Sequence, residues 1–320
     1  MSASAAPDLA TEVREAAIRH LWRQWQAVGG AVSGPGQANA IVDPEVLILT
    51  SFWMLDHERR LADVTGSWVR INSALLSIQR LGNLSRQFPE IVIERLGSLA
   101  AVGLAAKDIR WKSLRSKRAS SDLGMRDNKV RAIEAPLRSW ATLMLQLRRG
   151  MGVGAKADVL TYLLGINVTG LEWASVATIA EETGYTPAAV RRVADDLAAA
   201  SFIRVPGTGE GGRSLQRMYS ADPAAWVQLL RIGTHQPGWG YWRERFLFVI
   251  ALLQWLESLR SRKVSAYARD VEARELLTRH IGAIRRDRVV DPMELSGAEL
   301  NAEYLNRVAK ALINWMGNRG

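Results

Sequence analysis

The 320-residue chain contains no cysteine, and histidine is scarce. The absence of cysteine excludes disulfides, thiolate zinc sites and cysteine nucleophiles. The four histidines are scattered without metal-ligand spacing, and His57 in Asp56-His57-Glu58 has no second histidine four residues later, as a zinc-protease helix requires. We therefore expect no metal site.

Motifs for group transfer are also missing. The chain has no P-loop, no G-x-S-x-G sequence and no dinucleotide-binding glycine pattern leading into a helix. The glycine-rich stretch 207–212 lacks the Lys-Ser/Thr pair of a phosphate loop and lies between two strand-like segments. We expect neither enzymatic activity nor a cofactor.

Long hydrophobic runs are absent as well. The most apolar run, residues 246–256, contains Gln254 and is much shorter than the roughly 20 residues that span a bilayer. Residues 1–10 lack the basic and apolar regions of a secretion signal. These features predict a cytoplasmic protein with no membrane partner.

The chain does have ample material for hydrophobic cores and an excess of positive charge. Hydrophobic residues make up 48% of it, with 12 Trp, and the net charge is +10, which is typical of nucleic-acid-binding proteins. Apolar residues recur at helical spacing over most of its length. We predict a mainly α fold with a helical N-terminal domain (1–150), a central domain (151–223) and a helical C-terminal domain (224–320).

Residues 107–131 form a basic segment, with nine Lys and Arg against three Asp and a net charge of +6. Large apolar side chains are few there, so we expect an exposed loop, followed by a long helix over 130–149. Such a segment either contacts an anionic partner or serves as a solvated linker.

The central domain has the signals of two short helices joined by a tight turn. Ser175 is placed to cap the first helix and Gly184 to end it. Thr186 is placed to cap the second helix, with Pro187 at its first position and Ala200 near its end. A helix over 156–164 precedes this pair. The arrangement predicts a helix-turn-helix.

A β-hairpin is predicted to follow. Residues 202–205 and 215–220 have strand patterns, and the loop between them, 206–214, is rich in glycine. A hairpin in this position forms a wing.

Residues 175–203 resemble the helix-turn-helix of the bacterial ArsR/MarR-type winged-helix regulators, and the resemblance extends over one small domain, about 155–222. It implies a double-stranded DNA partner, a recognition helix at 187–200 that enters the major groove, and a wing at 206–214. Ser201 occupies the position where such domains usually end the recognition helix with glycine.

The resemblance and the charge pattern together identify the candidate DNA contacts. Arginine can pair with both acceptors of guanine, which makes Arg191 and Arg192 the main candidates. An alternative is that Arg191–Asp195 and Arg192–Asp196 are ordinary i,i+4 ion pairs on a solvated helix. The full set is Lys156, Ser175, Thr186, Ala188, Ala189, Arg191, Arg192, Arg213 and Arg217, with Lys112, Arg115, Lys117 and Arg118 from the basic segment.

The charge of the central domain leaves two hypotheses open. Residues 154–222 have six basic and eight acidic groups, whereas DNA affinity depends largely on phosphate neutralisation. Either the basic segment lies beside the recognition helix and supplies that charge, or the winged helix binds a protein. The first describes a sequence-specific regulator, a dimeric repressor of a nearby operon; the second describes an adaptor or antitoxin-like subunit. The apolar helix predicted over 242–259 is either a dimer contact or internal core.

Overall fold

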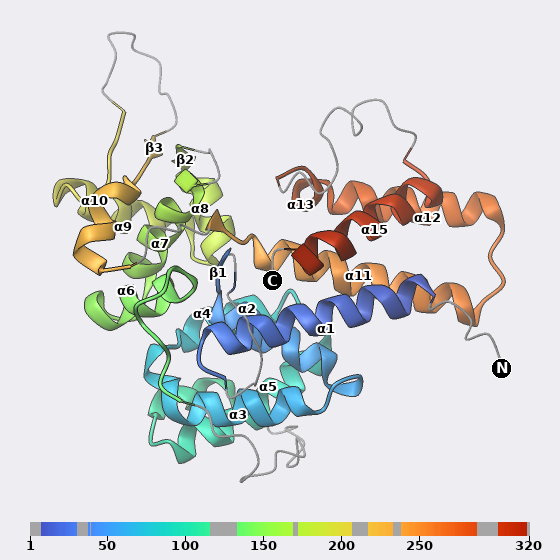
Figure 1. Cartoon of the computed structure of the whole chain (residues 1–320), viewed down its shortest axis with the longest axis horizontal. Helices are drawn as coiled ribbons and strands as arrows, with labels where there is room; N and C mark the ends of the chain where they lie inside the picture. The colour runs from blue at the N-terminus through green and yellow to red at the C-terminus, as the bar shows by residue number, and fades with distance from the viewer. Residues whose placement is uncertain are drawn as a thin grey trace. The chain divides into compact units, whose positions relative to one another are not determined.

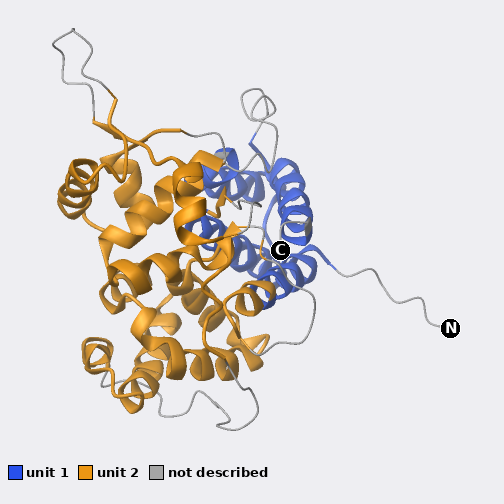
Figure 2. Ribbon diagram, turned by 60° about the vertical axis from the view of Figure 1, so that its left-hand side comes forward, with its two compact units in different colours: residues 1–22, 241–320 blue, residues 23–240 orange. Residues whose placement is uncertain are grey.

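The computed structural model describes residues 8–30, 38, 40–115, 133–168, 172–206, 217–232, 238–286 and 300–318, and it is mainly helical, as predicted (Figure 1). The chain divides into two compact units (Figure 2), residues 23–240 and residues 1–22 with 241–320. The larger unit thus contains most of the predicted N-terminal domain (1–150) and all of the predicted central domain (151–223). The division into three domains stays a prediction. No helix in the described part of the chain has the length and apolar character needed to cross a membrane.

The first half of the larger unit is a group of helices around a buried central one. Asp43 caps that helix and Pro44 is its first residue, as the sequence predicts, and nine of its ten residues are buried. Its neighbours pack around it. The elements are α2 (Pro44–Trp53), η1 (Met54–Asp56), α3 (Arg60–Asn72), η2 (Ser73–Leu75), α4 (Ile78–Ser85), α5 (Glu90–Ala105) and η3 (Ile109–Leu114).

The second half contains three mutually packed helices and short strands. The helices α7 (Ala155–Val168), α8 (Val176–Thr183) and α9 (Pro187–Ala199) contact one another. Strand β2 (Ala174–Ser175) pairs antiparallel with β3 (Met218–Tyr219), and β1 (Ala40–Ile41) pairs parallel with β4 (Gly238–Trp239). The remaining elements are η4 (Trp140–Thr142), α6 (Leu143–Met151) and α10 (Pro223–Leu230).

The prediction of one long helix over 130–149 is wrong. Residues 133–139 are not helical, η4 follows, and α6 begins only at Leu143. Pro136 lacks a backbone N–H, and Ser139 adopts an extended conformation from which its Oγ accepts the Ala141 N–H. Because of these two residues, the helix begins at Leu143 and not at residue 130, where the apolar pattern starts.

The smaller unit is built from α1 (Leu9–Ala27, whose last residues belong to the larger unit), α11 (Trp242–Ser261), α12 (Ala266–Arg279), α13 (Ile281–Arg286) and α15 (Ala302–Asn318). Its core is aromatic: the His20 ring lies 4.8 Å from Trp242, and the Arg245 guanidinium lies 3.8 Å above the Trp315 ring. Phe246, Val249, Ile250 and Leu253 of α11 are all buried within the single chain. The apolar character of α11 therefore does not by itself require a second copy.

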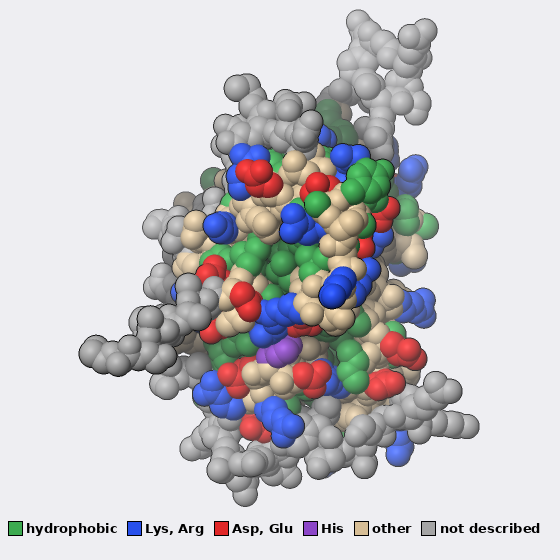
Figure 3. Space-filling model, turned by 90° about the vertical axis from the view of Figure 1, so that its right-hand side faces the viewer, with side chains coloured by type: hydrophobic (Ala, Val, Ile, Leu, Met, Phe, Trp, Pro, Cys, Tyr) green, Lys and Arg blue, Asp and Glu red, His purple; other side chains and the backbone are tan. Residues whose placement is uncertain are grey.

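The molecular face drawn in Figure 3 has a mixed surface. Lys and Arg side chains alternate on it with Asp and Glu, and neither sign gathers into a patch. This face therefore has no positively charged patch that could bind an anionic partner.

Candidate nucleic-acid interface

The turn between α8 and α9 is formed by capping residues that lie close together in the sequence. Ser175 Oγ accepts the Thr178 N–H at 3.2 Å, and Thr186 Oγ1 accepts the Ala189 N–H at 3.3 Å. Gly184 ends α8 with φ +72°, a left-handed conformation that favours glycine. A Cβ at Gly184 would also lie 2.8 Å from Leu84, so this turn packs closely against α4.

The helix α9 has one buried and one exposed face. Val190, Val193 and Leu197 are buried. On the other face Thr186, Ala188, Arg191 and Arg192 are exposed, and Ala189 is half-buried. Five of the predicted contacts thus lie on one short stretch of chain, four of them open to solvent.

A buried ionic network holds this turn to the first half of the unit. The Arg80 guanidinium donates to Asp43, to Glu45 and, through Nε, to the carbonyl of Thr183 at the end of α8. Arg148 of α6 donates two hydrogen bonds to Asp158 of α7, at 2.7 and 2.8 Å. It also bonds Glu45 at 2.7 and 3.0 Å, so Glu45 joins the two arginines.

Tyr185 connects the α8–α9 turn to the same network. Its hydroxyl donates to Asp158 Oδ2 at 2.8 Å, and burial together with the Asp158 charge raises the pKa of Tyr185 above its ordinary range. Burial opposes the ionisation of Asp43, but the charge of Arg80 outweighs it and keeps the pKa of Asp43 below its ordinary value. Although burial opposes it, the neighbouring carboxylates raise the pKa of Arg80 and of Arg148, and the hydrogen bonds of the network tie the α8–α9 turn to α2 and α6.

The C-terminus of α9 explains how serine replaces the usual glycine. The Ser201 N–H bonds the carbonyl of Ala198 and the Phe202 N–H bonds that of Leu197, which is the paired pattern of a Schellman cap. In that pattern the residue after the cap is left-handed, and Ser201 has φ +59°. A side chain in this conformation is strained.

Replacing Ser201 with glycine should raise the free energy of unfolding by about 0.5–1 kcal/mol, because glycine adopts positive φ without the steric cost. Urea unfolding followed by circular dichroism measures the change. Ser201→Ala is the matched control, since alanine retains the Cβ and should give no gain. Equal stability of the glycine and alanine variants would contradict the assignment of strain to this position.

The region predicted as a wing is described only at its base. Arg204 and Ser220 form an antiparallel bridge next to the β2–β3 pair. The predicted strand 202–205 is thus reduced to a single bridge residue, and in the described part of 215–220 residues 218–220 are paired. Arg217 is exposed and bonds Asp195 Oδ1 at 2.8 Å, and Tyr219 donates to the same oxygen. Residues 207–216, with the predicted contact Arg213, lie outside the described residues.

Three expectations about single residues change. Ser175 is buried and its hydroxyl caps α8, so it acts inside the fold and is not a surface contact, contrary to the prediction. The i,i+4 pairs of Arg191 and Arg192 do not form. Asp195 is taken by Arg217, and Asp196 lies 3.6 Å from the ammonium of Lys156 at the start of α7. Among the described residues, Arg191 and Arg192 make no ion pair.

The described part of the basic segment is anchored. Trp111 is fully buried against α5 and donates to Ser73 Oγ at 2.7 Å. Arg110 bonds Asp108, and this bond is the main reason that the pKa of Asp108 falls to about 2. Lys112 and Arg115 are exposed, whereas Lys117 and Arg118 lie outside the described residues. The segment thus begins as a fixed 3-10 helix and not, as predicted, as a loop.

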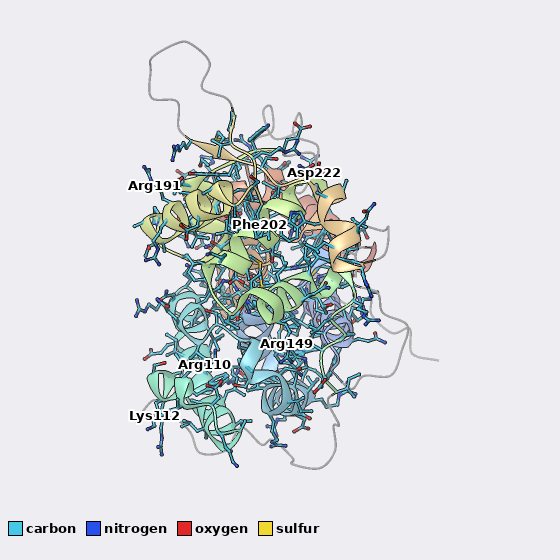
Figure 4. The ribbon with its side chains drawn as sticks, turned by 90° about the vertical axis from the view of Figure 1, so that its left-hand side faces the viewer. Arg110, Lys112, Arg149, Arg191, Phe202 and Asp222 are labelled. Atoms are coloured by element: carbon cyan, nitrogen blue, oxygen red, sulfur yellow. The ribbon has the colours of Figure 1, made fainter. Side chains whose placement is uncertain are left out.

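A groove of about 990 Å³ connects this anchored segment with α9. Arg192 and Ala189 line one side of it, and Arg110 and Ser113 of η3 line another. Arg86, after the end of α4, lines it as well; its sequence neighbourhood has no feature that distinguishes it from other surface arginines. Arg191 and Lys112 project from the same side of the larger unit in Figure 4.

Comparisons of the whole chain with protein-family models, with curated proteins and with solved structures gave no match. The described residues contain no cluster of three or more His, Asp or Glu with the geometry of a metal site. The function is therefore inferred from this interface alone.

Proposed function

We propose that the protein is a sequence-specific regulator of transcription that binds double-stranded DNA through a winged helix-turn-helix formed by residues 155–222. In this proposal α9 enters the major groove, and its exposed Arg191 and Arg192 contact base edges. The strands β2 and β3 and the Arg204–Ser220 bridge would form the base of the wing.

One observation carries the proposal: the exposed face of α9 and the anchored start of the basic segment line the same groove. The central domain alone has an excess of acidic groups, so it needs phosphate-neutralising charge from another part of the chain. Arg110 in the groove wall is paired with Asp108, and the exposed Lys112 and Arg115, which follow it in the chain, add positive charge next to this wall.

The pairing of the acidic residues on α9 also favours a DNA-facing role. Asp195 and Asp196 are each neutralised by a cation from outside the helix, Arg217 and Lys156. Arg191 and Arg192 consequently have no carboxylate partner among the described residues and can pair with an external anion. A solvated helix with no partner would more simply pair its own arginines with its own aspartates.

The test is a titration of labelled duplex DNA from the region upstream of the protein's own coding sequence, and of a scrambled duplex, with the wild type and with Arg191→Ala/Arg192→Ala. We expect the wild type to prefer its own duplex. The double variant should lose that preference, and its affinity should fall by about 30-fold to 10,000-fold or more, at 1–3 kcal/mol for each of the two base contacts.

The control removes two positive charges from the smaller unit, where Arg269 and Lys310 are exposed. Arg269→Ala/Lys310→Ala should keep the preference. Equal, weak binding of both duplexes by the wild type, unchanged in the α9 variant, would rule out sequence-specific recognition by this helix.

A specific observation supports a second candidate, a protein-binding role for the same domain. Phe202 is 44% exposed beside Trp226, and Leu229, three residues later on α10, is 70% exposed. Apolar side chains that gather on a surface often mark a protein contact. If the wild type binds no DNA and Phe202→Ser no longer binds a protein partner of the wild type, the results would favour this adaptor role.

Dimerisation remains part of the first proposal because two-fold dimers read pseudo-palindromic operators.

A further inference from the structure

The groove beside α9 has walls of one charge sign. Three arginines line it (Arg86, Arg110 and Arg192), and no Asp or Glu is among its lining residues. Arg110 is held by Asp108 and by the carbonyls of Ser73 and Leu76. Arg86 and Arg192 are exposed, and among the described residues neither makes an ion pair.

Neutral hydrogen-bond donors line the groove together with apolar side chains. Gln79 and Asn83 of α4 both line the groove, on the same helix that ends next to Arg86. Amide N–H groups and guanidinium groups are the donors that commonly bond phosphate and sugar oxygens. The wall formed by α4 thus offers a row of donors without an acceptor carboxylate.

The position of the groove relative to α9 indicates what would occupy it. Residues four apart share a side of a helix, so Arg191 lies on the side of Asp195, toward Arg217, and Arg192 lies on the side of Asp196, toward Lys156. Consecutive residues are about 100° apart around a helix, so the two arginines point to different sides of the exposed face of α9. A helix in the major groove has one DNA strand on each side, and the groove is on the Arg192 side.

Resting on the proposed function, we propose that this groove holds the sugar-phosphate backbone of one DNA strand, with Arg86 as a phosphate contact. Arg192 stands at the boundary between the groove and the base-reading face. Gln79 and Asn83 contribute neutral hydrogen bonds along the strand. The wall formed by α4 and η3 would then supply the phosphate charge that the central domain lacks.

The experiment measures the affinity of Arg86→Gln for the upstream duplex and for the scrambled duplex over a series of salt concentrations. A phosphate contact carries no sequence information, so affinity should fall by the same factor on both duplexes, on the order of fivefold at moderate salt. The slope of log K against log salt should decrease in magnitude by about 0.9, the value for one phosphate. The ratio of the two affinities should not change.

Arg59→Gln is the matched control, because Arg59 is an exposed arginine of the same unit that does not line the groove. Arg86 is exposed, so its variant should fold, and circular dichroism verifies this. If the wild type binds DNA and the two variants Arg86→Gln and Arg59→Gln have the same affinity and salt dependence, the groove assignment is overturned and the proposed function stays intact. A change in the affinity ratio would overturn it by showing a base contact. No DNA binding by the wild type would overturn both.

Discussion

Arg148→Met should lower the free energy of unfolding by about 3–5 kcal/mol, the usual loss when one partner of a buried ion pair is removed. Arg148 is 1% exposed and is the guanidinium that Asp158 and Glu45 share. Methionine fills much of the same volume but leaves both carboxylates with less compensating charge in the interior. Urea unfolding of the variant, followed by circular dichroism, measures the loss.

The neighbouring Arg149 supplies a matched control, since it is exposed on the same helix α6. Arg149→Met should change the free energy of unfolding by less than about 0.5 kcal/mol. Arg148→Lys should fall between the two, because lysine retains the charge but cannot make the forked bonds to Asp158 and Glu45. Similar stability of the two methionine variants would show that the network contributes little to folding.

A functional consequence accompanies the loss of stability. The network reaches the α8–α9 turn through Tyr185, which donates to Asp158, and through Thr183, whose carbonyl accepts from Arg80. Any Arg148 variant that remains folded should therefore position α9 less firmly. Under the proposed function, the DNA affinity of such a variant should decrease more than that of Arg149→Met, although neither residue is proposed to touch DNA.

Trp111→Ala should also cost about 3–5 kcal/mol, the range for a buried tryptophan replaced by alanine. The ring is fully buried, and its Nε1 donates to Ser73 Oγ at 2.7 Å. It lies directly on Gly103 of α5, where a Cβ would come within 2.4 Å of the ring. Only glycine permits this approach, so Gly103 and Trp111 together fix η3 to the helical core.

The same unfolding measurement on Trp173→Ala is the control for this prediction, because Trp173 is 37% exposed and should cost far less. Since η3 forms one wall of the groove and bears Lys112, the folded fraction of Trp111→Ala should also bind DNA more weakly. A loss below about 1 kcal/mol would mean that η3 does not depend on this anchor.

The bounds of α8 and α9 could largely be predicted because their signals are local. A capping serine or threonine, a proline at the first helical position and a glycine after the last act within a few residues of themselves. Ser175, Gly184, Thr186 and Pro187 therefore occupy the structural positions that their sequence context indicates. Ser175 was correctly predicted as a helix cap but was also predicted as a DNA contact. Its hydroxyl is buried and already accepts the Thr178 N–H, so it does not lie on the surface.

Predictions that depended on periodicity alone were less reliable. The apolar pattern after residue 130 suggests a continuous helix, but Pro136 and Ser139 interrupt it through backbone effects that a pattern of side chains does not register. Likewise, the i,i+4 spacing on α9 suggests local ion pairs. Asp195 and Asp196 instead bond Arg217 and Lys156, which are distant along the chain but near in space.

By itself, the sequence determined that the protein is mainly helical, where α8 and α9 begin, and which side chains α9 leaves on its outer face. These properties follow from composition, helical spacing and capping. Only the tertiary structure decided that Arg80 and Arg148 are buried charges and that Arg86, Arg110 and Arg192 line one groove. Arg86 and Arg192 are over a hundred positions apart in the sequence and line the same groove because α4 and α9 lie close together in the fold. Capping and helical spacing act between near neighbours in the sequence, so they do not encode this proximity.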